Sequence, residues 1–440
     1  MERETWGSKM GFWLAAAGSA IGLGNIWRFP YLTGANGGAA FVFIYLLIVF
    51  TIGISVMIAE FTIGRNTNLN AVGAFQKLKA GPWQIAGWMG VIAGFVILSY
   101  YSVVGGWTIK YILSSFTDMI STSTDTTSYF LSFIANGPQT LLFHAIFMAI
   151  VIFIVYRGVG KGIEDTCKIL MPALFLLLVI LIIRAVTLPG ALAGIDFYLN
   201  PDFSKVTGKT ILAALGQAFF SLSLGMGCMI TYGSYIKSKK ESLPKSAATI
   251  TLLDTGAAFL AGFVIFPTVF AFGAEPSAGA GLTFITLPKV FAMMPGGQIW
   301  SALFFLLLCV AAITSAISLL EVVVAYVIDN LKWPRHKAAL IIGGTIFLLG
   351  IPSALSQGAV SINVLGMSFL DFLDFVANNI LLTVGGLLIS LFVGWVIPEI
   401  AKKETTAHGA FPFQPIWLWI CRVVAPVAIF IIILGGFGLF

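Results

Sequence analysis

Residues 18–31 read GSAIGLGNIWRFPY, and they lie inside an apolar run long enough to form a membrane helix. Glycine and proline are poor helix formers, and an arginine is costly in a lipid environment. A continuous helix would not place three glycines, an asparagine, an arginine and a proline together in its middle. The stretch therefore predicts a membrane helix that is interrupted near Gly22-Leu23-Gly24.

The composition sets the broad class of the protein. Of its 440 residues, 59% are hydrophobic and 10% are charged, whereas about a quarter of the residues of a soluble domain are charged. Apolar runs of about 20 residues, the length that crosses a bilayer, recur along the chain. The net charge of +6 does not indicate nucleic-acid binding, because the positive residues fall at the ends of these runs. The sequence predicts an all-α polytopic protein that resides in the lipid bilayer and binds no nucleic acid.

The apolar runs predict eleven spans in a single transmembrane domain that covers residues 1–440. The predicted spans are 10–36, 39–63, 84–115, 140–156, 168–188, 208–236, 244–272, 299–329, 337–354, 365–397 and 414–438. The longer loops are 116–139, 189–207 and 273–298, and the last of them has room for a short helix between turn-forming clusters.

Lys and Arg residues indicate the orientation, because cytoplasmic loops carry an excess of them. With the N-terminus inside, most of the 24 basic residues fall in cytoplasmic segments. These are Arg3, Lys9, Arg65, Lys77, Lys79, Arg157, Lys161, Lys168, Lys237, Lys239, Lys240, Lys245, Lys332, Arg335, Lys337, Lys402 and Lys403. The sequence thus predicts a multi-pass protein of the plasma membrane with a cytoplasmic N-terminus and, after eleven spans, an external C-terminus.

A second interruption repeats the pattern of the first. The sixth predicted span contains FFSLSLGMGCMITYGSY, with Gly225-Met226-Gly227 at its middle. Each half would contain five spans, an odd number, so residues 208–400 would run inverted relative to residues 10–190. An extra helix would follow at about 412–438. Paired interrupted spans in two halves are typical of transporters built on an inverted repeat. The alternative is that these glycines only allow close packing of helices.

Breaking a helix in hydrocarbon frees backbone groups that must find partners. Carbonyl groups can coordinate a cation, and the N-terminus of a half-helix attracts an anionic group. An α-amino acid supplies both complements, a carboxylate and an ammonium group. The two interruptions therefore favour a transporter whose cargo completes the missing hydrogen bonds.

Three stretches together resemble a known family. WGSKMGFWLAAAGSAIGLGNIWRFPYLTGANGG, GQAFFSLSLGMG and AAITSAIS resemble the neurotransmitter:sodium symporter family, including its bacterial amino-acid transporters, and the similarity runs from about residue 3 to 400. The resemblance implies a five-plus-five inverted-repeat fold with broken helices 1 and 6, and sodium-driven import of an amino acid by alternating access. Members commonly have twelve spans, and some bacterial members, like this chain, have eleven.

The resemblance also implies two sodium sites. The first would use the Ala20 carbonyl, Asn25, Ser221, Asp254 and the substrate carboxylate. The second would use the carbonyls of Gly18, Ile21 and Ala311 and the hydroxyls of Thr314 and Ser315. The alternative for Thr314 and Ser315 is hydrogen bonding to their own helix.

Asp254 departs from part of the family. Many members have asparagine at this position, and the animal transporters add a chloride ion that is held by a serine one helical turn later. Here that later residue is Ala258, and the carboxylate of Asp254 can supply the negative charge itself. We therefore expect transport to be independent of chloride, although a purely structural partner for Asp254 is the alternative.

Gly22 bears on the class of substrate. Monoamine transporters of the family have an aspartate at this position, whereas Gly22 leaves space for a substrate that brings its own carboxylate. The resemblance implies a pocket for a neutral hydrophobic amino acid, aliphatic or aromatic, with the carboxylate near the Leu23 and Gly24 amides. The expected substrate-binding residues are Ser19, Ala20, Gly22, Leu23, Gly24, Ile97, Tyr101, Phe220, Ser221, Ser223, Met226, Ser315 and Leu319.

Two gates are implied in the same way. The outer gate would pair Arg28 with Asp374 above a lid of Tyr101 and Phe220, and the inner gate would pair Arg3 with Asp329. The inner network would also include Trp6, Ser234 and Tyr235. Glu60 is expected to bond to exposed backbone of broken span 6. The cytoplasmic part of span 5 would unwind between Gly162 and Pro172, or the two residues simply mark a helix start and a kink.

Other functions have less support. An enzyme would need a nucleophile with a base or a metal cluster, and His144, His336 and His408 are far apart in sequence. A receptor or sensor that binds sodium and an amino acid without transport is the alternative on the same scaffold. One copy of the chain is expected to suffice for function, and oligomers are compatible with it.

Overall fold

A computed structural model describes residues 3–79, 81–117, 119–237, 241–276 and 281–437. Lys239 and Lys240, two of the residues that indicate the orientation, lie outside the described residues, as does residue 438 at the end of the extra helix.

Within the described residues, nine helices are long and apolar enough to cross a membrane. They are Ala39–Thr67, Gln84–Ser114, Gly137–Tyr156, Val159–Val186, Leu243–Ala271, Gly297–Leu331, Arg335–Leu355, Phe369–Val396 and Gln414–Gly436. The uninterrupted ones are α6 (Gln84–Ser114), α8 (Gly137–Tyr156), α13 (Leu243–Ala271), α15 (Gly297–Leu331) and α16 (Arg335–Leu355). The two predicted spans missing from this set are the first and the sixth, which were expected to be interrupted.

The other long helices contain π-helical segments (η). They comprise α3 (Ala39–Ile48), η2 (Val49–Gly53) and α4 (Ile54–Thr67); η3 (Val159–Glu164) and α9 (Asp165–Val186); α17 (Phe369–Val376), η6 (Ala377–Leu382), α18 (Thr383–Leu391) and η7 (Phe392–Val396); and α20 (Gln414–Trp419), η8 (Ile420–Val424) and α21 (Ala425–Gly436). Each π turn shifts the register of the helix, which changes the side chains that face the interior.

Both expected interruptions are present. The first span consists of α1 (Lys9–Ala20), η1 (Gly24–Arg28) and α2 (Phe29–Ala35), and the backbone becomes extended at Ile21. The sixth consists of α11 (Gly208–Ser221) and α12 (Cys228–Ser234). Between them Ser223, Gly225 and Gly227 have positive φ angles of 54°, 77° and 74°. Glycine adopts this conformation without steric cost, which explains the Gly-x-Gly motif at the second break.

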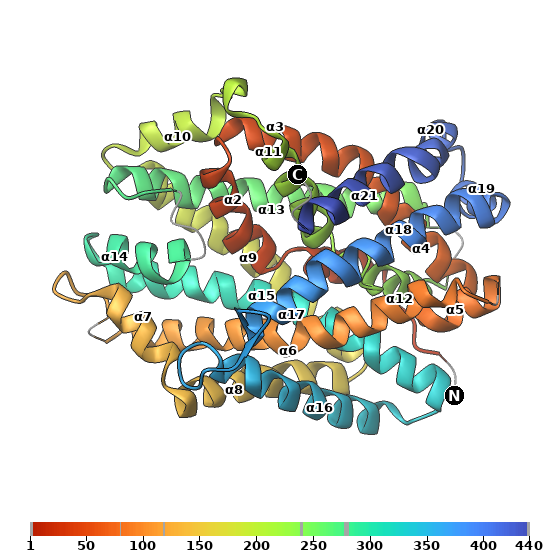
Figure 1. Cartoon of the computed structure of the whole chain (residues 1–440), viewed down its shortest axis with the longest axis horizontal. Helices are drawn as coiled ribbons and strands as arrows, with labels where there is room; N and C mark the ends of the chain where they lie inside the picture. The colour runs from red at the N-terminus through yellow and green to blue at the C-terminus, as the bar shows by residue number, and fades with distance from the viewer. Residues whose placement is uncertain (1–2, 80, 118, 238–240, 277–280, 438–440) are drawn as a thin grey trace.

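The spanning helices lie roughly alongside one another, with the short helices at the two ends of the bundle (Figure 1). Helices α6 and α15 pack against each other at its centre. One end carries α7 (Thr126–Ile134), α10 (Ala191–Leu199) and η5 (Leu282–Thr286) with α14 (Leu287–Ala292), and the other carries α5 (Ala71–Leu78) and α19 (Pro398–Thr406). The helix expected in the loop 273–298 is therefore present. A 3-10 turn, η4 (Phe203–Lys205), lies between α10 and α11.

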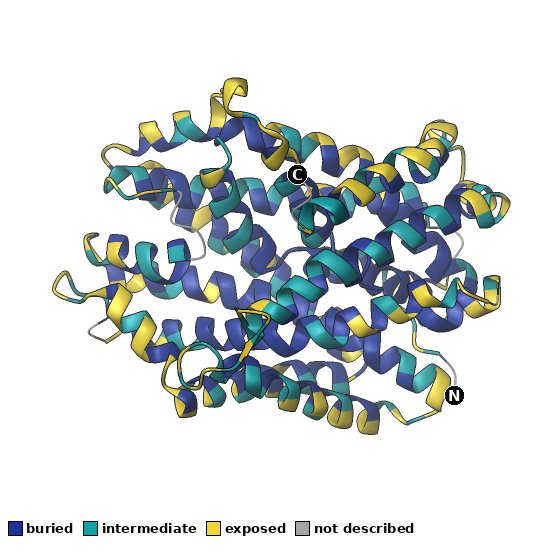
Figure 2. Ribbon diagram, viewed as in Figure 1, coloured by how far each residue is buried: buried dark blue, intermediate teal, exposed yellow. Residues whose placement is uncertain are grey.

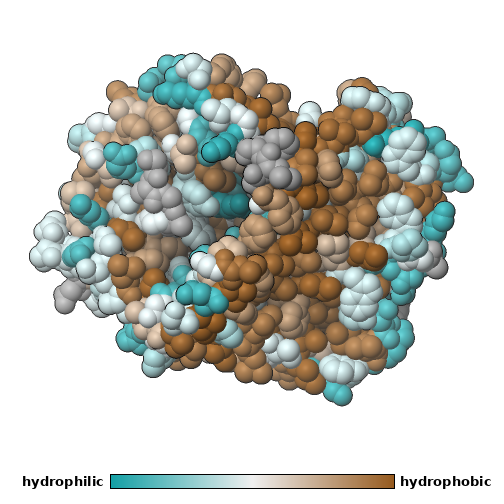
Figure 3. Space-filling view, in the orientation of Figure 1, coloured by the Kyte–Doolittle hydropathy of each residue, from teal (hydrophilic) through white to brown (hydrophobic). Residues whose placement is uncertain are grey.

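Burial follows the arrangement expected in a bilayer. Buried residues fill the middle of the bundle (Figure 2), while large apolar side chains such as Phe153, Ile169 and Leu348 are exposed on spanning helices. Figure 3 shows hydrophobic side chains over a broad central part of one face, with most hydrophilic side chains toward its edges. An exposed apolar surface of this size needs lipid to cover it.

Two predicted boundaries are wrong. Span 5 begins at Val159 rather than at residue 168, because η3 continues directly into α9. The segment from Gly162 to Pro172 is thus helical in this conformation, with Pro172 inside α9. Span 10 begins at Phe369 rather than at residue 365, because β1 (Asn363–Val364) and β2 (Met367–Ser368) form an antiparallel hairpin that pairs Asn363 with Ser368.

Candidate substrate and ion sites

The backbone freed by the first break bonds to side chains of its own span and of neighbouring helices. The Gly22 amide donates to Asn25 Oδ1 at 3.0 Å, and the Leu23 amide donates to the Tyr101 hydroxyl at 3.1 Å. Gln217 on α11 donates to the Gly24 carbonyl at 2.7 Å. Sequence reasoning missed Gln217, although an amide side chain within an apolar helix is itself a signal of a polar partner.

Residues expected to bind the first sodium ion come together around Asp254. Asn25 Nδ2 donates to Asp254 Oδ1 at 2.7 Å, and Ser221 Oγ donates to Asp254 Oδ2 at 3.0 Å. All three side chains are buried, and Ala20 lines the central cavity. The group offers oxygen atoms, the donors that hard cations prefer.

The residues expected at the second sodium site also meet, between α1 and α15. Ser315 Oγ lies 3.3 Å from the carbonyl oxygens of both Gly18 and Ile21. Thr314 Oγ1 lies 3.4 Å from the Ile21 oxygen and 3.0 Å from the Ala311 oxygen. A hydroxyl has only one hydrogen to donate, so the acceptors in this group outnumber the donors. This excess of oxygen lone pairs fits a cation, even though Thr314 also bonds to its own helix.

A small central cavity lies between the two broken helices. It is lined by Ser19, Ala20, Gly22, Gly24, Ile97, Tyr101, Phe220, Ser223, Met226, Ser315 and Leu319. All of these were expected to bind substrate. Of the other two expected residues, Leu23 lines the neighbouring outer cavity and Ser221 bonds to Asp254.

Gly22 has no room for a side chain. A Cβ atom there would lie 2.4 Å from Ser315 Oγ and 2.8 Å from the Tyr101 hydroxyl. Gly24 is similarly close to Phe220, whose ring would lie 2.9 Å from an added Cβ. The backbone of the first break therefore forms the wall of the cavity directly, with the Leu23 amide bonded to the hydroxyl of Tyr101.

The outer gate residues surround a second cavity of about 200 Å³. It is lined by Leu23, Trp27, Arg28, Tyr31, Tyr100, Tyr101, Val104, Phe220, Leu370, Asp371 and Asp374. Tyr101 and Phe220 line both cavities, as expected of a lid between them. The Arg28 guanidinium lies 4.9 Å from the centre of the Phe220 ring. Arg28 and Asp374 share this cavity, but the ion pairs within 4.0 Å among the described residues do not include them.

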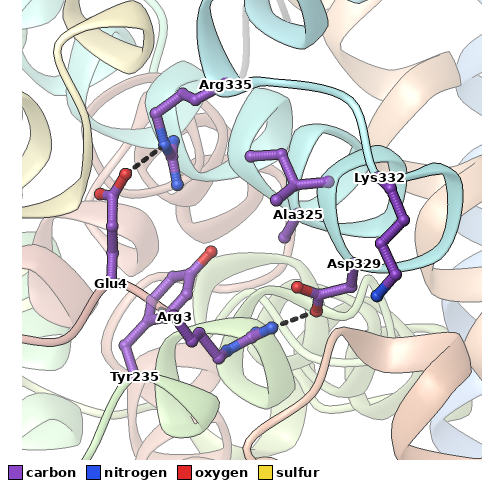
Figure 4. Close-up of a pocket in the computed structure, with 8 residues that line it drawn as sticks. Arg3, Glu4, Tyr235, Ala325, Asp329, Lys332 and Arg335 are labelled. Carbon is purple, nitrogen blue, oxygen red and sulfur yellow. Dashed lines mark hydrogen bonds and ion pairs between the residues drawn. The ribbon is translucent and has the colours of Figure 1, made fainter. Parts of the chain in front are cut away.

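The residues expected at the inner gate bond to one another (Figure 4). Arg3 forms an ion pair with Asp329 and also donates to Ser234 Oγ at 2.6 Å. Its guanidinium lies 4.9 Å from the centre of the Tyr235 ring. Trp6 donates to the Tyr232 carbonyl at 2.9 Å, so the N-terminal segment is attached to the end of α12 at several points. The residues expected at the inner gate are thus in contact, whereas those expected at the outer gate line a cavity.

A second ionic chain at this gate was missed. Arg335 donates to Glu4 Oε1 at 2.7 Å and to Glu321 Oε2 at 2.7 Å, and Tyr235 donates to Glu321 Oε1 at 2.5 Å. A cavity of about 190 Å³ lies beside both ion pairs, with Lys332 at its edge (Figure 4). The signal in the sequence was Glu321, because an acid within an apolar span requires a partner. Glu60 was correctly expected to bond to broken span 6, and it accepts from the Gly225 amide at 2.7 Å.

Two interrupted membrane helices around one cavity are typical of a membrane transporter. The model of the sodium:neurotransmitter symporter family matches residues 3–132 and 132–438. The chain is 42% identical to the sodium-dependent transporter YhdH of Bacillus subtilis, over 99% of this chain and 98% of that protein. It is 30% identical to the sodium- and chloride-dependent GABA transporter 2 of Rattus norvegicus, over 90% of this chain and 73% of that protein.

Among solved structures, the chain is similar to MhsT in complex with L-phenylalanine. The TM-score is 0.91 and the identity is 47%, over 99% of this chain and 100% of that one. The chain belongs to the sodium:neurotransmitter symporter family. It is a sodium-dependent membrane transporter with the five-plus-five inverted-repeat fold, and it is not an enzyme.

Proposed function

We propose that the protein imports neutral hydrophobic L-amino acids, both aliphatic and aromatic, together with two sodium ions and independently of chloride. The N-terminus would be cytoplasmic, the C-terminus external, and one copy of the chain sufficient. Transport would proceed by alternating access, with the gates of Arg28 and Asp374 outside and Arg3 and Asp329 inside opening in turn.

The close approach of Gly22 to Tyr101 and Ser315 supports an α-amino-acid substrate. An aspartate at position 22 would collide with both hydroxyl groups. The protein therefore offers no carboxylate at this position, and the site suits a substrate that carries its own carboxylate as well as an ammonium group. Its carboxylate would accept hydrogen bonds from the Leu23 and Gly24 amides and from Tyr101. The ammonium would meet carbonyl oxygens of Ala20, Phe220 and Ser223.

The apolar residues of the central cavity support a hydrophobic side chain on the substrate. Ile97, Met226 and Leu319 line this cavity, and methionine adapts its shape to different neighbours. The structural relative MhsT binds L-phenylalanine, which is consistent with an aromatic substrate here.

The arrangement couples sodium to the substrate through charge. Asn25, Ser221 and Asp254 would hold the first ion next to the bound carboxylate, so each would increase the affinity for the other. Thr314 and Ser315 would hold the second ion between α1 and α15, which stabilises their contact. Loss of that ion to the cytoplasm would weaken the contact and favour opening of the inner side.

Uptake into proteoliposomes tests the proposal. An inward sodium gradient is expected to drive accumulation of labelled phenylalanine and leucine above equilibrium, and competition by all twenty amino acids would give the specificity. Equal sodium on both sides is the control. Sodium-dependent binding without accumulation would refute transport and support the sensor instead.

Chloride replacement tests the role of Asp254. Uptake is expected to be the same in sodium gluconate as in sodium chloride, because the Asp254 carboxylate balances the charge of the ion beside it. The measurement is the initial rate at matched sodium and osmolarity. Loss of uptake in gluconate would contradict the assignment.

A further inference from the structure

The alternating sequence NTNLN, residues 66–70, covers the end of α4 and the linker to α5. Each of its three asparagines bonds to a different element. Asn66 donates to Glu404 on α19 at 3.0 Å, Asn68 bonds to the end of α12, and Asn70 bonds to the end of α15. This stretch therefore joins segments that are far apart in the sequence, on the side of the residues expected at the inner gate.

Asn68 holds the end of the second broken helix. It ends α4 with a positive φ of 52°, a conformation in which asparagine is favoured. Its amide donates to the carbonyl oxygens of Ser234 at 3.1 Å and Ile236 at 3.4 Å. The Ser234 carbonyl is at the C-terminal end of α12 and the Ile236 carbonyl lies just beyond it, so neither is used by the hydrogen bonds of that helix.

Asn70 holds the end of α15 and is fully buried. Its backbone amide donates to Asp329 Oδ2 at 2.9 Å, and its side chain donates to Asp329 Oδ2 at 3.1 Å and to Asn330 Oδ1 at 2.7 Å. Its side-chain oxygen accepts from the Gly73 amide at 3.1 Å and so caps α5. The side-chain oxygen of Asn70 therefore caps α5, and its side-chain nitrogen bonds to the end of α15.

The two residues that Asn68 and Asn70 hold are the two partners of Arg3. Arg3 pairs with the Asp329 carboxylate and donates to the Ser234 hydroxyl. We infer that Asn68 and Asn70 are positioning residues that assemble the receptor for Arg3, by keeping the ends of α12 and α15 together. This inference rests on the proposed alternating-access function, since it assigns to the linker a share of the closing of the inner gate.

The variant Asn70→Asp separates this role from capping. Aspartate caps a helix as well as asparagine does, so α5 is retained. Its side chain cannot donate to Asp329, although the backbone amide of residue 70 still does, and it places a second carboxylate beside the one that binds Arg3. If Asn70 only caps α5, the inner gate of Asn70→Asp closes as in the wild type, and only Asn70→Ala closes less well. If Asn70 positions Asp329, closing of the inner gate is impaired in Asn70→Asp at least as much as in Asn70→Ala.

The native thiol of Cys167 reports the state of the inner side. It is buried on α9, and its sulfur would lie 3.6 Å from a Cβ atom added to Gly18 of α1. Proteoliposomes holding sodium and phenylalanine would be labelled with N-ethylmaleimide, with alkylation of each cysteine followed by mass spectrometry. Asn70→Asp is expected to raise the labelling rate of Cys167 roughly tenfold, the effect of losing hydrogen bonds to a charged group. The labelling of Cys421, which is packed between helices elsewhere, is expected not to change.

Asn136→Asp is the matched control, because Asn136 is an exposed cap of α8 that accepts from the Gln139 amide at 3.1 Å. Asn68→Gly keeps the left-handed backbone without the side chain, and it gives a second test if Asn70→Asp does not fold. Wild-type labelling of Cys167 in both Asn70→Asp and Asn68→Gly would overturn the inference. So would an increase in Asn70→Ala alone. Wild-type uptake, measured in the same vesicles, tests the proposed function separately, because its failure would leave the differences in labelling intact.

Discussion

Replacing Gly22 by alanine is expected to lower sodium-driven uptake roughly a hundredfold, the scale of loss that follows from a misplacement of about 1 Å at a binding site. The added Cβ atom would lie 2.4 Å from Ser315 Oγ and 2.8 Å from the Tyr101 hydroxyl. Either the backbone of the first break or these two side chains must then move. Tyr101 bonds to the Leu23 amide and Ser315 faces the Gly18 and Ile21 carbonyls, so one methyl group disturbs the sites for both substrate and sodium.

The measurement is the initial uptake rate, together with binding of labelled phenylalanine in detergent at saturating sodium. Gly344→Ala is the control, since a Cβ atom at Gly344 on α16 would meet no atom within 4 Å. It is expected to transport as the wild type does. Normal uptake by Gly22→Ala would show that the cavity tolerates the extra methyl group, and it would remove the argument that Gly22 selects an amino acid.

The features that could be predicted from the residues alone are those that produce a local sequence pattern. The membrane spans follow from runs of apolar residues, and the two breaks follow from Gly-x-Gly motifs at positions where a continuous helix would avoid them. The central cavity follows from the breaks, because freed backbone in a membrane must face a partner. Tyr101 and Phe220 carry no such local pattern, and only the family resemblance placed them beside Gly22.

The contacts at the inner gate produce no local sequence pattern. Asn70 meets Asp329, and Glu4 meets Arg335, across separations of hundreds of residues. Neither pair has a periodic pattern, and in the sequence each residue is a polar residue near the end of an apolar run, a position where polar residues are common. The π-helical start of span 5 was missed because Gly162 and Pro172 favour an unwound segment, or a helix start and a kink. In the structure the Val159 amide bonds to Glu4 and the Gly7 amide bonds to Glu164, so the N-terminal segment holds this turn.

Replacing Asp254 by asparagine is expected to lower the apparent affinity for sodium roughly tenfold, because a full charge next to the ion is lost. Asn25 and Ser221 keep their positions beside an amide of the same shape, so the fold is retained. Chloride is expected not to restore the affinity, because the residue one turn later is Ala258 and offers no donor. The measurement is uptake as a function of sodium, in chloride and in gluconate.

The double variant Asp254→Asn with Ala258→Ser completes the test. The new hydroxyl would lie one turn from position 254, on a side of α13 where Tyr45 is also buried near Ser221 and Asp254. Hydroxyl donors without a nearby carboxylate favour an anion. The double variant is therefore expected to bind sodium more tightly in chloride than in gluconate. Ala258→Ser alone is the control, since a hydroxyl beside the Asp254 carboxylate leaves the charge balanced and transport independent of chloride. If the single Asp254→Asn variant keeps wild-type sodium affinity in gluconate, the carboxylate does not balance the charge of the ion, and the reason for expecting chloride independence is lost.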